Sequence, residues 1–269
     1  MSPQPDQTLV FRARHLCRDF KRTNGSATTV VHAVNDVSLD VAAGQRLGIV
    51  GESGSGKSTL VRMLAALMRP TKGSLQFCGQ EITGLQERDL GELRKGVQVV
   101  FQDPRSSLDP RMKVSRIITE PLRSPLLRGR PDLPAPAERL VEVMRQVGLD
   151  PSDADLYPHE FSGGQRQRIA IARALAPRPQ VLIADEAVSA LDVSVRAQVL
   201  NLIDALVRQE GLTLLFVSHD LSVVRHVCDT IAVMRDGAII ECGPSAQVYE
   251  QPQHDYTREL LAAIPRVRI

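Results

Sequence analysis

The stretch GESGSGKST, residues 51–59, constrains the fold of this chain more than any other part of the sequence. It matches G-x-x-x-x-G-K-[ST]. It lies between a short apolar run that predicts a strand, GQRLGIV, and a periodic run that predicts a helix ending near Pro70. The glycines let the backbone curl so that consecutive N–H groups point inward at the helix N-terminus, which favours phosphate oxygens. The alternative is a flexible loop beside a surface lysine, and the flanking strand and helix argue against it.

Lys57 and Ser58 give this loop its predicted chemistry. We expect the Lys57 ammonium to bridge the β- and γ-phosphates of a nucleotide and to act in catalysis. The Ser58 hydroxyl is expected to bind a Mg²⁺ ion that also holds these phosphates. The predicted nucleotide-binding residues of the loop are Gly51, Ser53, Gly54, Ser55, Gly56, Lys57, Ser58 and Thr59.

Two adjacent acids follow a second apolar strand, in the stretch VLIADE. The strand would bring Asp185 to the carboxyl edge of a sheet, where its carboxylate can hold Mg²⁺ through the water shell. Glu186, one residue further on, is expected to orient or deprotonate the attacking water. Two solvated acids at the end of a strand are the alternative interpretation.

His219 and Gln102 also come at the ends of apolar runs, LLFVSH and GVQVVFQ. His219 could contact the γ-phosphate or the attacking water, although a histidine after a buried strand is often structural. The Gln102 amide oxygen could reach Mg²⁺ or the water, with the same ambiguity.

The nucleotide base is predicted to be adenine, because the guanine-specific N-K-x-D motif is not found in the sequence. Aromatic residues make up only 3% of the chain, and Phe20 is the candidate for stacking on the base. Phe11 competes for this role but lies in an alternating run and suits the core better, and Phe20 itself could be a core residue.

The composition is that of an ordinary globular protein, with 43% hydrophobic and 24% charged residues in 269. A formal net charge of +2 gives no electrostatic reason to expect a nucleic acid partner. The four cysteines form no CxxC pair, so neither a zinc site nor a disulfide framework is predicted, and a reducing cytosol fits. We find no signal-peptide core and no long apolar stretch, so any membrane connection is expected to come through a partner.

The order of the patterns predicts an α/β fold. Alternating runs in residues 9–49 predict antiparallel strands, helical patterns surround Ile117 and Val141, and helices alternate with strands after Phe161. A hairpin is expected to turn at Asp236-Gly237. We therefore predict a P-loop NTPase core with a mostly parallel sheet, an N-terminal antiparallel β subdomain and an inserted α-helical subdomain. The predicted parts are residues 1–102, 103–162 and 163–269.

The stretch FSGGQRQRIAIARAL begins like half of a phosphate site. Ser162 can offer a hydroxyl, and Gly163 and Gly164 can offer N–H groups at a helix N-terminus, followed by Gln165. No lysine or preceding strand accompanies them. The alternative is an ordinary helix cap, with Ser162 accepting bonds from backbone N–H groups.

The order of these motifs resembles that of the nucleotide-binding subunit of an ATP-binding cassette transporter. The motifs are the loop of residues 51–59, called the lysine loop here, followed by Gln102, FSGGQ, VLIADE, SALD and His219. The resemblance implies that Ser162, Gly163, Gly164 and Gln165 complete the ATP site of a second subunit in a head-to-tail dimer. It also implies that Asp192, in SALD, lies at the dimer seam and couples the two sites. The family usually has Pro-Thr after the glutamate, where this chain has Ala187-Val188. That change frees φ at the turn, yet normal hydrolysis is expected.

Three further stretches resemble the ATPase subunits of oligopeptide, dipeptide and nickel importers: FQDPRSSLDPRMKVSRIITEPL, YPHEFSGGQRQRIAIARAL and QPQHDYTRELLAAIP. The resemblance implies a peripheral position at the cytoplasmic face of the inner membrane. The implied partners are a second ATPase subunit, which can be a non-identical one, two integral membrane permease subunits and, indirectly, an extracytoplasmic substrate-binding protein. The region after Gln102, with Asp103, Pro104 and the helical insertion, would face the membrane subunits.

Two other functions compete with import. A soluble cassette ATPase of DNA repair or translation usually carries two cassettes or long coiled-coil insertions, and the sequence contains neither. A metabolic P-loop kinase would have no use for SGGQ. Import driven by ATP hydrolysis is therefore the favoured function.

Overall fold

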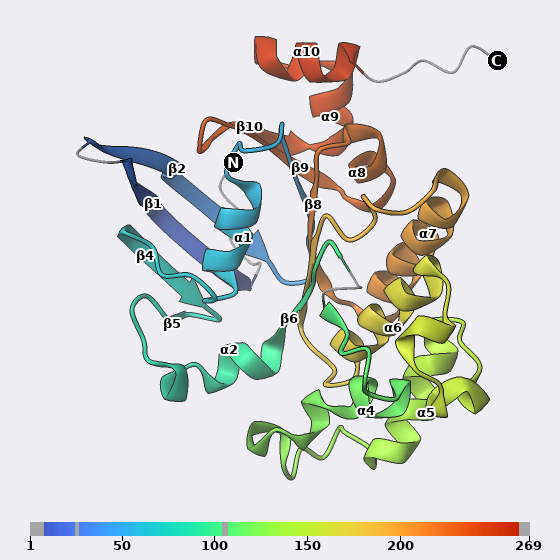
Figure 1. The fold of residues 1–269 in the computed structure, drawn as a ribbon. Helices are drawn as coiled ribbons and strands as arrows, with labels where there is room; N and C mark the ends of the chain where they lie inside the picture. Colours follow the sequence, from blue (N-terminus) through green and yellow to red (C-terminus); the bar gives the residue numbers. More distant parts are fainter. Residues whose placement is uncertain (1–7, 25–26, 104–106, 264–269) are drawn as a thin grey trace, which may run out of the picture. The chain divides into compact units, whose positions relative to one another are not determined.

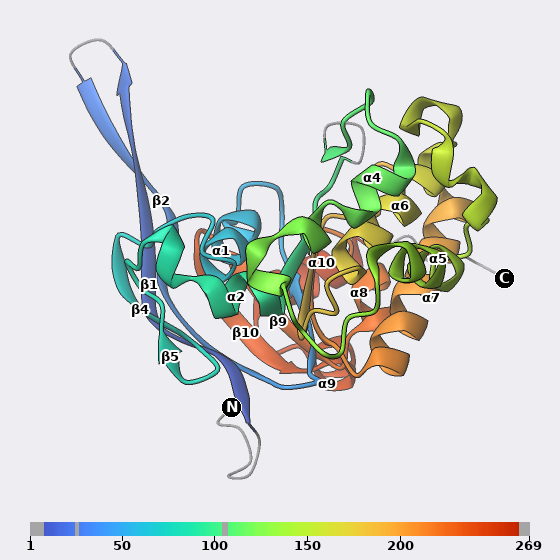
Figure 2. The ribbon, with the colours of Figure 1, turned by 90° about the horizontal axis from the view of Figure 1, so that it is seen from below.

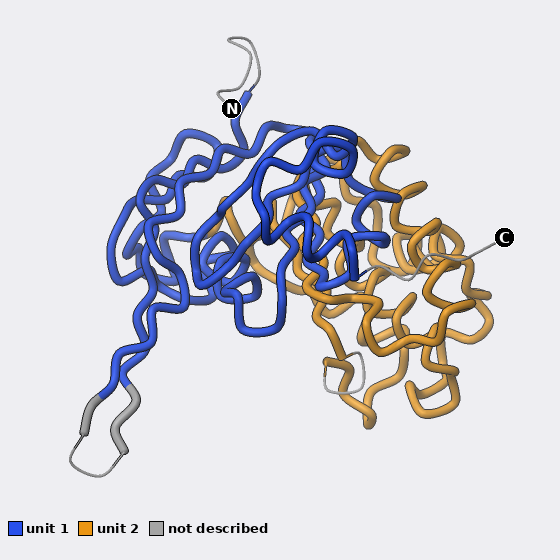
Figure 3. Tube along the Cα trace, turned by 90° about the horizontal axis from the view of Figure 1, so that it is seen from above, with its two compact units in different colours: residues 1–90, 213–269 blue, residues 91–212 orange. Residues whose placement is uncertain are grey.

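The structure, a computed structural model, describes the backbone of residues 8–24, 27–103 and 107–263, and the side chains of these residues except 22–24 and 27–28. The chain forms two compact units, residues 1–90 with 213–269 and residues 91–212 (Figure 3). The lysine loop belongs to the first unit, and the two predicted acids belong to the second. The predicted division into residues 1–102, 103–162 and 163–269 stays a prediction.

An antiparallel sheet opens the first unit, as the alternating runs predict. Strand β1 (Leu9–Asn24) pairs with β2 (Ala27–Ala42) and β4 (Lys72–Phe77), and β5 (Gln80–Glu81) pairs with β4 (Figure 1). Phe11 is fully buried, and its ring centroid lies 5.3 Å from that of Phe77 on the neighbouring strand. Phe11 is therefore a core residue, as expected.

The first unit also holds a largely parallel group of strands. Strand β3 (Arg46–Val50) pairs in parallel with β8 (Thr213–Ser218) and β9 (Thr230–Arg235), and β10 (Ala238–Pro244) runs antiparallel to β9. All of β8 and four of the five residues of β3 are buried, which explains why both strands read as continuous apolar runs. The helices of this unit are α1 (Lys57–Leu64), α8 (Leu221–Val227), α9 (Ser245–Glu250) and α10 (Asp255–Ala262).

Two local predictions in this unit can be compared with the structure. The hairpin between β9 and β10 turns at Asp236 and Gly237, with φ angles of 50° and 82°, so that prediction is confirmed. Helix α1 ends at Leu64 and not near Pro70, so that prediction is wrong. Ala66 has a φ of 48°, and a left-handed residue cannot continue a right-handed helix.

The second unit combines two parallel strands with most of the longer helices. Strand β6 (Val97–Val100) pairs with β7 (Val181–Asp185), and Val100 lies beside Ala184. Its described part contains the helices α2 (Gly91–Gly96), α4 (Val114–Thr119), α5 (Pro136–Gln146), α6 (Gly163–Leu175) and α7 (Val193–Glu210) (Figure 2). Helix α6 contacts α4, α5 and α7. The predicted helical patterns around Ile117 and Val141 correspond to α4 and α5.

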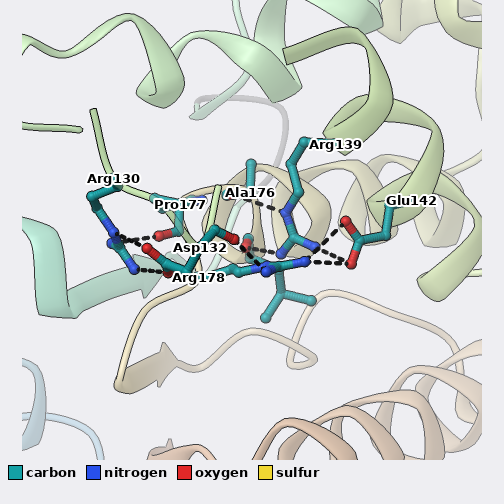
Figure 4. A network of polar contacts seen from close by, with 8 residues as sticks. Arg130, Asp132, Arg139, Glu142, Ala176, Pro177 and Arg178 are labelled. Atoms are coloured by element: carbon teal, nitrogen blue, oxygen red, sulfur yellow. Dashed lines mark hydrogen bonds and ion pairs between the residues drawn. The ribbon is translucent and has the colours of Figure 1, made fainter. Parts of the chain in front are cut away.

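A buried arginine fixes the carboxyl end of α6 (Figure 4). Arg139 is 2% exposed, and its guanidinium donates to the carbonyl oxygens of Leu175 at 2.7 Å and Ala176 at 3.0 Å. Its Nη1 atom lies 2.7 Å from the Glu142 carboxylate, which also pairs with Arg178 at 3.1 Å. The last carbonyls of a helix have no partner within it, so these bonds satisfy them. They hold α6 at the end opposite to Ser162.

Within the described part of the chain, no helix combines the length and the apolar character that crossing a lipid bilayer requires.

Candidate nucleotide-binding site

The lysine loop leaves the carboxyl end of β3 through backbone that only glycine accommodates. Gly51 has a φ of 152° and Gly56 a φ of 101°. A Cβ atom at Gly51 would lie well under 3.0 Å from the carbonyl oxygen of Met234, and one at Gly56 would lie equally close to that of Ala33. The loop is therefore packed tightly against its neighbours and keeps its curled shape.

Lys57 is the first residue of α1 and is only 4% exposed. Its ammonium donates to the carbonyl oxygens of Gly51 at 2.8 Å and Glu52 at 2.7 Å, and the Ser55 Oγ atom lies 3.4 Å away. A buried ammonium needs acceptors of this kind, and phosphate oxygens are acceptors that also carry negative charge. The loop thus fits a phosphate group, by its shape and by its charge.

The other predicted loop residues lie around this lysine. Ser55 is buried, and Ser58 and Thr59 are half-buried in the first turn of α1. Ser53 and Gly54 are exposed at the tip of the loop. Their contacts with a nucleotide stay predictions.

The structure places His219 beside the start of this loop. Val50, the last residue of β3, pairs with Ser218, the last residue of the parallel strand β8. Gly51 and His219 are the next residues after these two, so they leave the sheet side by side at the same edge. His219 is exposed. That exposure suits contact with a bound group better than a structural role in the core, and the role itself stays a prediction.

Phe20 lies on an exposed patch that continues toward the loop. It is 36% exposed and pairs across the sheet with Val31, which is 51% exposed, and the Arg18 guanidinium lies 4.8 Å from the Phe20 ring centroid. Directly paired residues share one face of a sheet. Two residues after Val31, the carbonyl of Ala33 packs against Gly56 of the loop. Phe20 is therefore no core residue, and its position suits stacking on a base.

In the second unit, Asp185 is the last residue of β7 and Glu186 follows it, as predicted. Asp185 is 4% exposed, and Glu186 is half-buried with a φ of 50°. Ser189 donates to the Glu186 carbonyl from its N–H at 3.1 Å and its hydroxyl at 2.9 Å. Left-handed backbone at a glutamate costs on the order of 1–3 kcal/mol, and such residues cluster at functional sites.

The turn after Glu186 is held without the Pro-Thr pair that is usual in the resembled family. Ala187 and Val188 are 1% and 3% exposed, so both side chains are packed in the core. Together with the two bonds from Ser189, this packing compensates for the conformational freedom that Ala187 has and proline lacks.

Gln102 is exposed. Val100 pairs with Ala184 in the sheet, and Gln102 and Glu186 each lie two residues beyond this pair, at the same edge. The second unit thus brings these two side chains to one edge.

The predicted Mg²⁺ ligands are Ser58 in the first unit and Gln102 and Asp185 in the second, and their oxygen atoms are of the type that Mg²⁺ binds. Among the described residues no three His, Cys, Asp or Glu side chains form a metal cluster. The magnesium site stays a prediction.

Ser162 is the N-cap of α6, so the helix-cap interpretation holds within the chain. Its Oγ accepts the N–H of Gln165 at 3.3 Å, and the Gln165 side chain accepts the N–H of Ser162 at 2.9 Å. Accepting a bond leaves the hydroxyl hydrogen for donation, and both residues are exposed. The structure therefore leaves the predicted phosphate contact untested.

The start of α7 packs against the start of α6. A Cβ atom at Gly164 would lie well under 3.0 Å from the Val195 side chain, so glycine is required for this approach. Asp192 caps α7 by accepting the Val195 N–H at 3.0 Å and the Ser194 hydroxyl at 2.8 Å. These hydrogen bonds lower the pKa of Asp192, and the bond from the Val195 N–H has the larger effect.

One contact of the loop was missed by sequence reasoning. The N–H of Glu52 donates to the Tyr256 hydroxyl at 3.0 Å, across a sequence separation of 204 residues. The stretch QPQHDYTREL contributed to the family resemblance, but no local pattern in it indicated a contact with the loop.

Comparison with known proteins identifies the class. The family model described as ABC transporter matches residues 34–189, and the chain belongs to this family. The family predicted from the motifs is therefore confirmed.

The chain is also similar to proteins named glutathione import ATP-binding protein GsiA. It is 50% identical over 264 residues to that of Escherichia coli K12 and 49% identical over 259 residues to that of Salmonella paratyphi A. These alignments cover 97% and 95% of the chain but 42% and 41% of the relatives, so the chain spans about two fifths of their length.

Solved structures confirm the predicted fold class. A dimeric post-hydrolysis structure of the ATP-binding cassette MJ0796 with ADP and Pi has a TM-score of 0.75 and 27% identity, covering 87% of this chain and 98% of that one. CbiO1 of Clostridium perfringens, part of the ABC transporter complex cbiONQ, has a TM-score of 0.76 and 26% identity over 97% of this chain and 98% of its own.

Proposed function

We propose that this chain is an ATPase subunit that drives the import of a solute across a membrane. The observation that carries the proposal is the buried Lys57 ammonium, held by carbonyl oxygens inside a glycine loop at the end of a parallel strand. The import activity is inferred from the relatives named for glutathione import.

Each predicted residue has a part in this function. The loop N–H groups and Lys57 bind the phosphates of ATP, and Phe20 stacks on adenine. Ser58, Gln102 and Asp185 would hold Mg²⁺, which neutralises phosphate charge when bound. Glu186 accepts a proton from the attacking water, and His219 orients that water or the γ-phosphate.

The partners and cargo follow from the same similarity. We infer a second ATPase subunit, with ATP held between the lysine loop of one chain and Ser162 to Gln165 of the other. The dimeric MJ0796 cassette supports this arrangement. Two permease subunits and an extracytoplasmic substrate-binding protein would complete an importer at the cytoplasmic face of the membrane. Glutathione is a tripeptide, so a short peptide is the cargo class that the relatives favour.

The proposed catalytic role of Glu186 can be tested with Glu186→Gln. The amide cannot accept the proton, so ATP hydrolysis should fall by about 10²- to 10⁴-fold while ATP binding is retained and the closed dimer accumulates. Glu210→Gln, at the exposed end of α7, is the matched control and should hydrolyse ATP like the unmodified chain. Undiminished hydrolysis by the Glu186 variant would exclude Glu186 as the base.

Co-purification after mild detergent extraction tests the transport role. Recovery with hydrophobic integral membrane subunits supports import. Recovery with ribosomes or DNA in their place would support the soluble cassette ATPases of translation or DNA repair and contradict the proposal.

A further inference from the structure

Helix α10 contacts the lysine loop through one buried tyrosine. Tyr256, in the first turn of the helix, is 3% exposed. Its hydroxyl accepts the N–H of Glu52 at 3.0 Å, and Glu52 is the second residue of the loop. A side chain outside the nucleotide motifs is thus bonded directly to the backbone of the loop.

The peptide groups of Glu52 are held from two sides. Its N–H is bonded to Tyr256, and its carbonyl oxygen accepts the Lys57 ammonium at 2.7 Å. In the proposed function Lys57 directs its ammonium to phosphate oxygens. The Glu52 carbonyl would keep the N–H of Ser55, which donates to it at 3.2 Å within the loop, and the bond to Tyr256 would hold the Glu52 N–H from outside the loop when a nucleotide is bound.

The position of the tyrosine ring is itself fixed. The Arg235 guanidinium lies 4.7 Å from the Tyr256 ring centroid. Arg235 ends β9 and precedes the turn in which the N–H of Gly237 donates to the Ser55 carbonyl at 3.1 Å. The β9–β10 hairpin therefore contacts Tyr256 through Arg235 and the lysine loop through Gly237.

The start of α10 is anchored by a carboxylate from β10. Glu241 accepts the N–H groups of Gln253 at 2.9 Å and His254 at 3.1 Å, and the hydroxyl of Thr257 also donates to it. These bonds fix the backbone just before the helix and the side chain of Thr257, the residue that follows Tyr256. The start of α10, which carries Tyr256, is therefore held in place by β10.

We propose that Tyr256 is a positioning residue of the nucleotide site, with its hydroxyl holding the Glu52 peptide so that the loop is formed before phosphate binds. This inference rests on the proposed function, because it assumes that the loop binds ATP. A loop that is ordered in advance loses less conformational entropy on binding, which gives higher affinity.

Tyr256→Phe removes the hydroxyl and keeps the ring over which Arg235 lies. Tyr249→Phe is the matched control, because the Tyr249 hydroxyl donates to the Leu221 carbonyl and its ring lies 4.9 Å from the Arg225 guanidinium, and neither of these residues belongs to the lysine loop. We expect Tyr256→Phe in the full chain to bind a fluorescent ATP analogue about 3- to 10-fold more weakly, as the loss of one hydrogen bond predicts. The KM for ATP should rise by the same factor, and kcat should change by less than about two-fold.

Amide hydrogen exchange at Glu52 provides a direct second measurement. It should become faster in Tyr256→Phe and stay unchanged in Tyr249→Phe, although each variant loses one hydrogen bond and both should unfold at a slightly and comparably lower temperature than the unmodified chain. Unchanged affinity and unchanged exchange in Tyr256→Phe would overturn the inference. If the unmodified chain failed to bind the analogue, or if Lys57→Ala bound it equally well, the proposed function would fail instead.

Discussion

Gly54 and Gly56 show how neighbouring glycines of one loop can be required for different reasons. Both have positive φ angles, 85° and 101°. A Cβ atom at Gly54 would meet no atom within 4 Å, whereas one at Gly56 would collide with the carbonyl oxygen of Ala33. The first position has only the backbone preference of glycine, and the second also has a steric requirement.

Gly56→Ala should therefore destabilise the chain more than Gly54→Ala. We expect the free energy of unfolding to fall by about 1 kcal/mol for Gly54→Ala, from backbone strain alone, and by about 3 kcal/mol or more for Gly56→Ala. Urea denaturation of the two variants measures the difference. Equal losses would mean that β2 moves away from the loop without cost and that the close approach at Ala33 is unimportant.

Positions that depend on local spacing could be predicted from the sequence, and contacts between distant parts of the chain could not. The lysine loop follows from a few adjacent positions, and the structure shows Lys57 buried inside it. The Tyr256 contact and the burial of Arg139 need pairings that only the folded chain creates. The left-handed φ of Glu186 was also missed, because no glycine or asparagine at that position indicates it.

At the level of helices and strands, boundaries were predicted best where a residue type enforces them. The β9–β10 hairpin turns at Asp236-Gly237 because aspartate and glycine tolerate the positive φ angles of a two-residue turn. The end of α1 was misplaced because Ala66, an excellent helix former, adopts a left-handed conformation. It is the left-handed residue of a Schellman motif, in which the N–H of Leu67 donates to the Arg62 carbonyl and the N–H of Ala66 donates to the Met63 carbonyl, both at 2.8 Å.

Helix α10 depends on the ionised form of Glu241. Burial disfavours the charge, but the hydrogen bonds from Gln253, Thr257 and His254 outweigh it, so the pKa of Glu241 is lowered. A lowered pKa in the folded state stabilises the fold at pH values above the ordinary glutamate pKa of about 4.3. This contribution is lost as the pH falls through the lowered pKa, when the carboxylate becomes protonated in the folded chain.

Glu241→Gln should accordingly destabilise the chain more at about pH 7 than at about pH 4. Urea denaturation of the variant and the unmodified chain at both pH values measures the difference. Glu250→Gln, at an exposed position that ends α9, serves as the control and should show no such dependence. A loss of stability that is the same at both pH values would contradict the role of the charge.

At the level of the whole molecule, the two halves of the proposed ATP site lie on different units of the chain. The lysine loop belongs to the unit with β3, and Ser162 caps α6 in the other unit. In the proposed dimer each ATP is bound by the loop of one chain and by Ser162 to Gln165 of the second chain. An altered Ser162 should therefore disable the site that contains the partner's lysine loop, and not the site that contains the loop of its own chain.

Ser162→Asp allows this to be tested without losing the helix cap. Aspartate is as good an N-cap as serine, so α6 should stay capped, while its carboxylate repels the γ-phosphate. Dimers of Ser162→Asp alone should hydrolyse ATP about 10²- to 10³-fold more slowly, whereas the neutral cap in Ser162→Asn should have a smaller effect.

A mixed dimer of Ser162→Asp with Lys57→Ala distinguishes the two arrangements. If each site is shared between chains, one site of the mixed dimer combines both defects, and the other combines an intact loop with an intact Ser162. Differently tagged chains, isolated by two successive affinity steps, should then recover about half of the hydrolysis rate of the unmodified dimer, because one of the two sites is restored. If each chain used its own Ser162, both sites would carry a defect, and the rate would stay at the level of the separate variants.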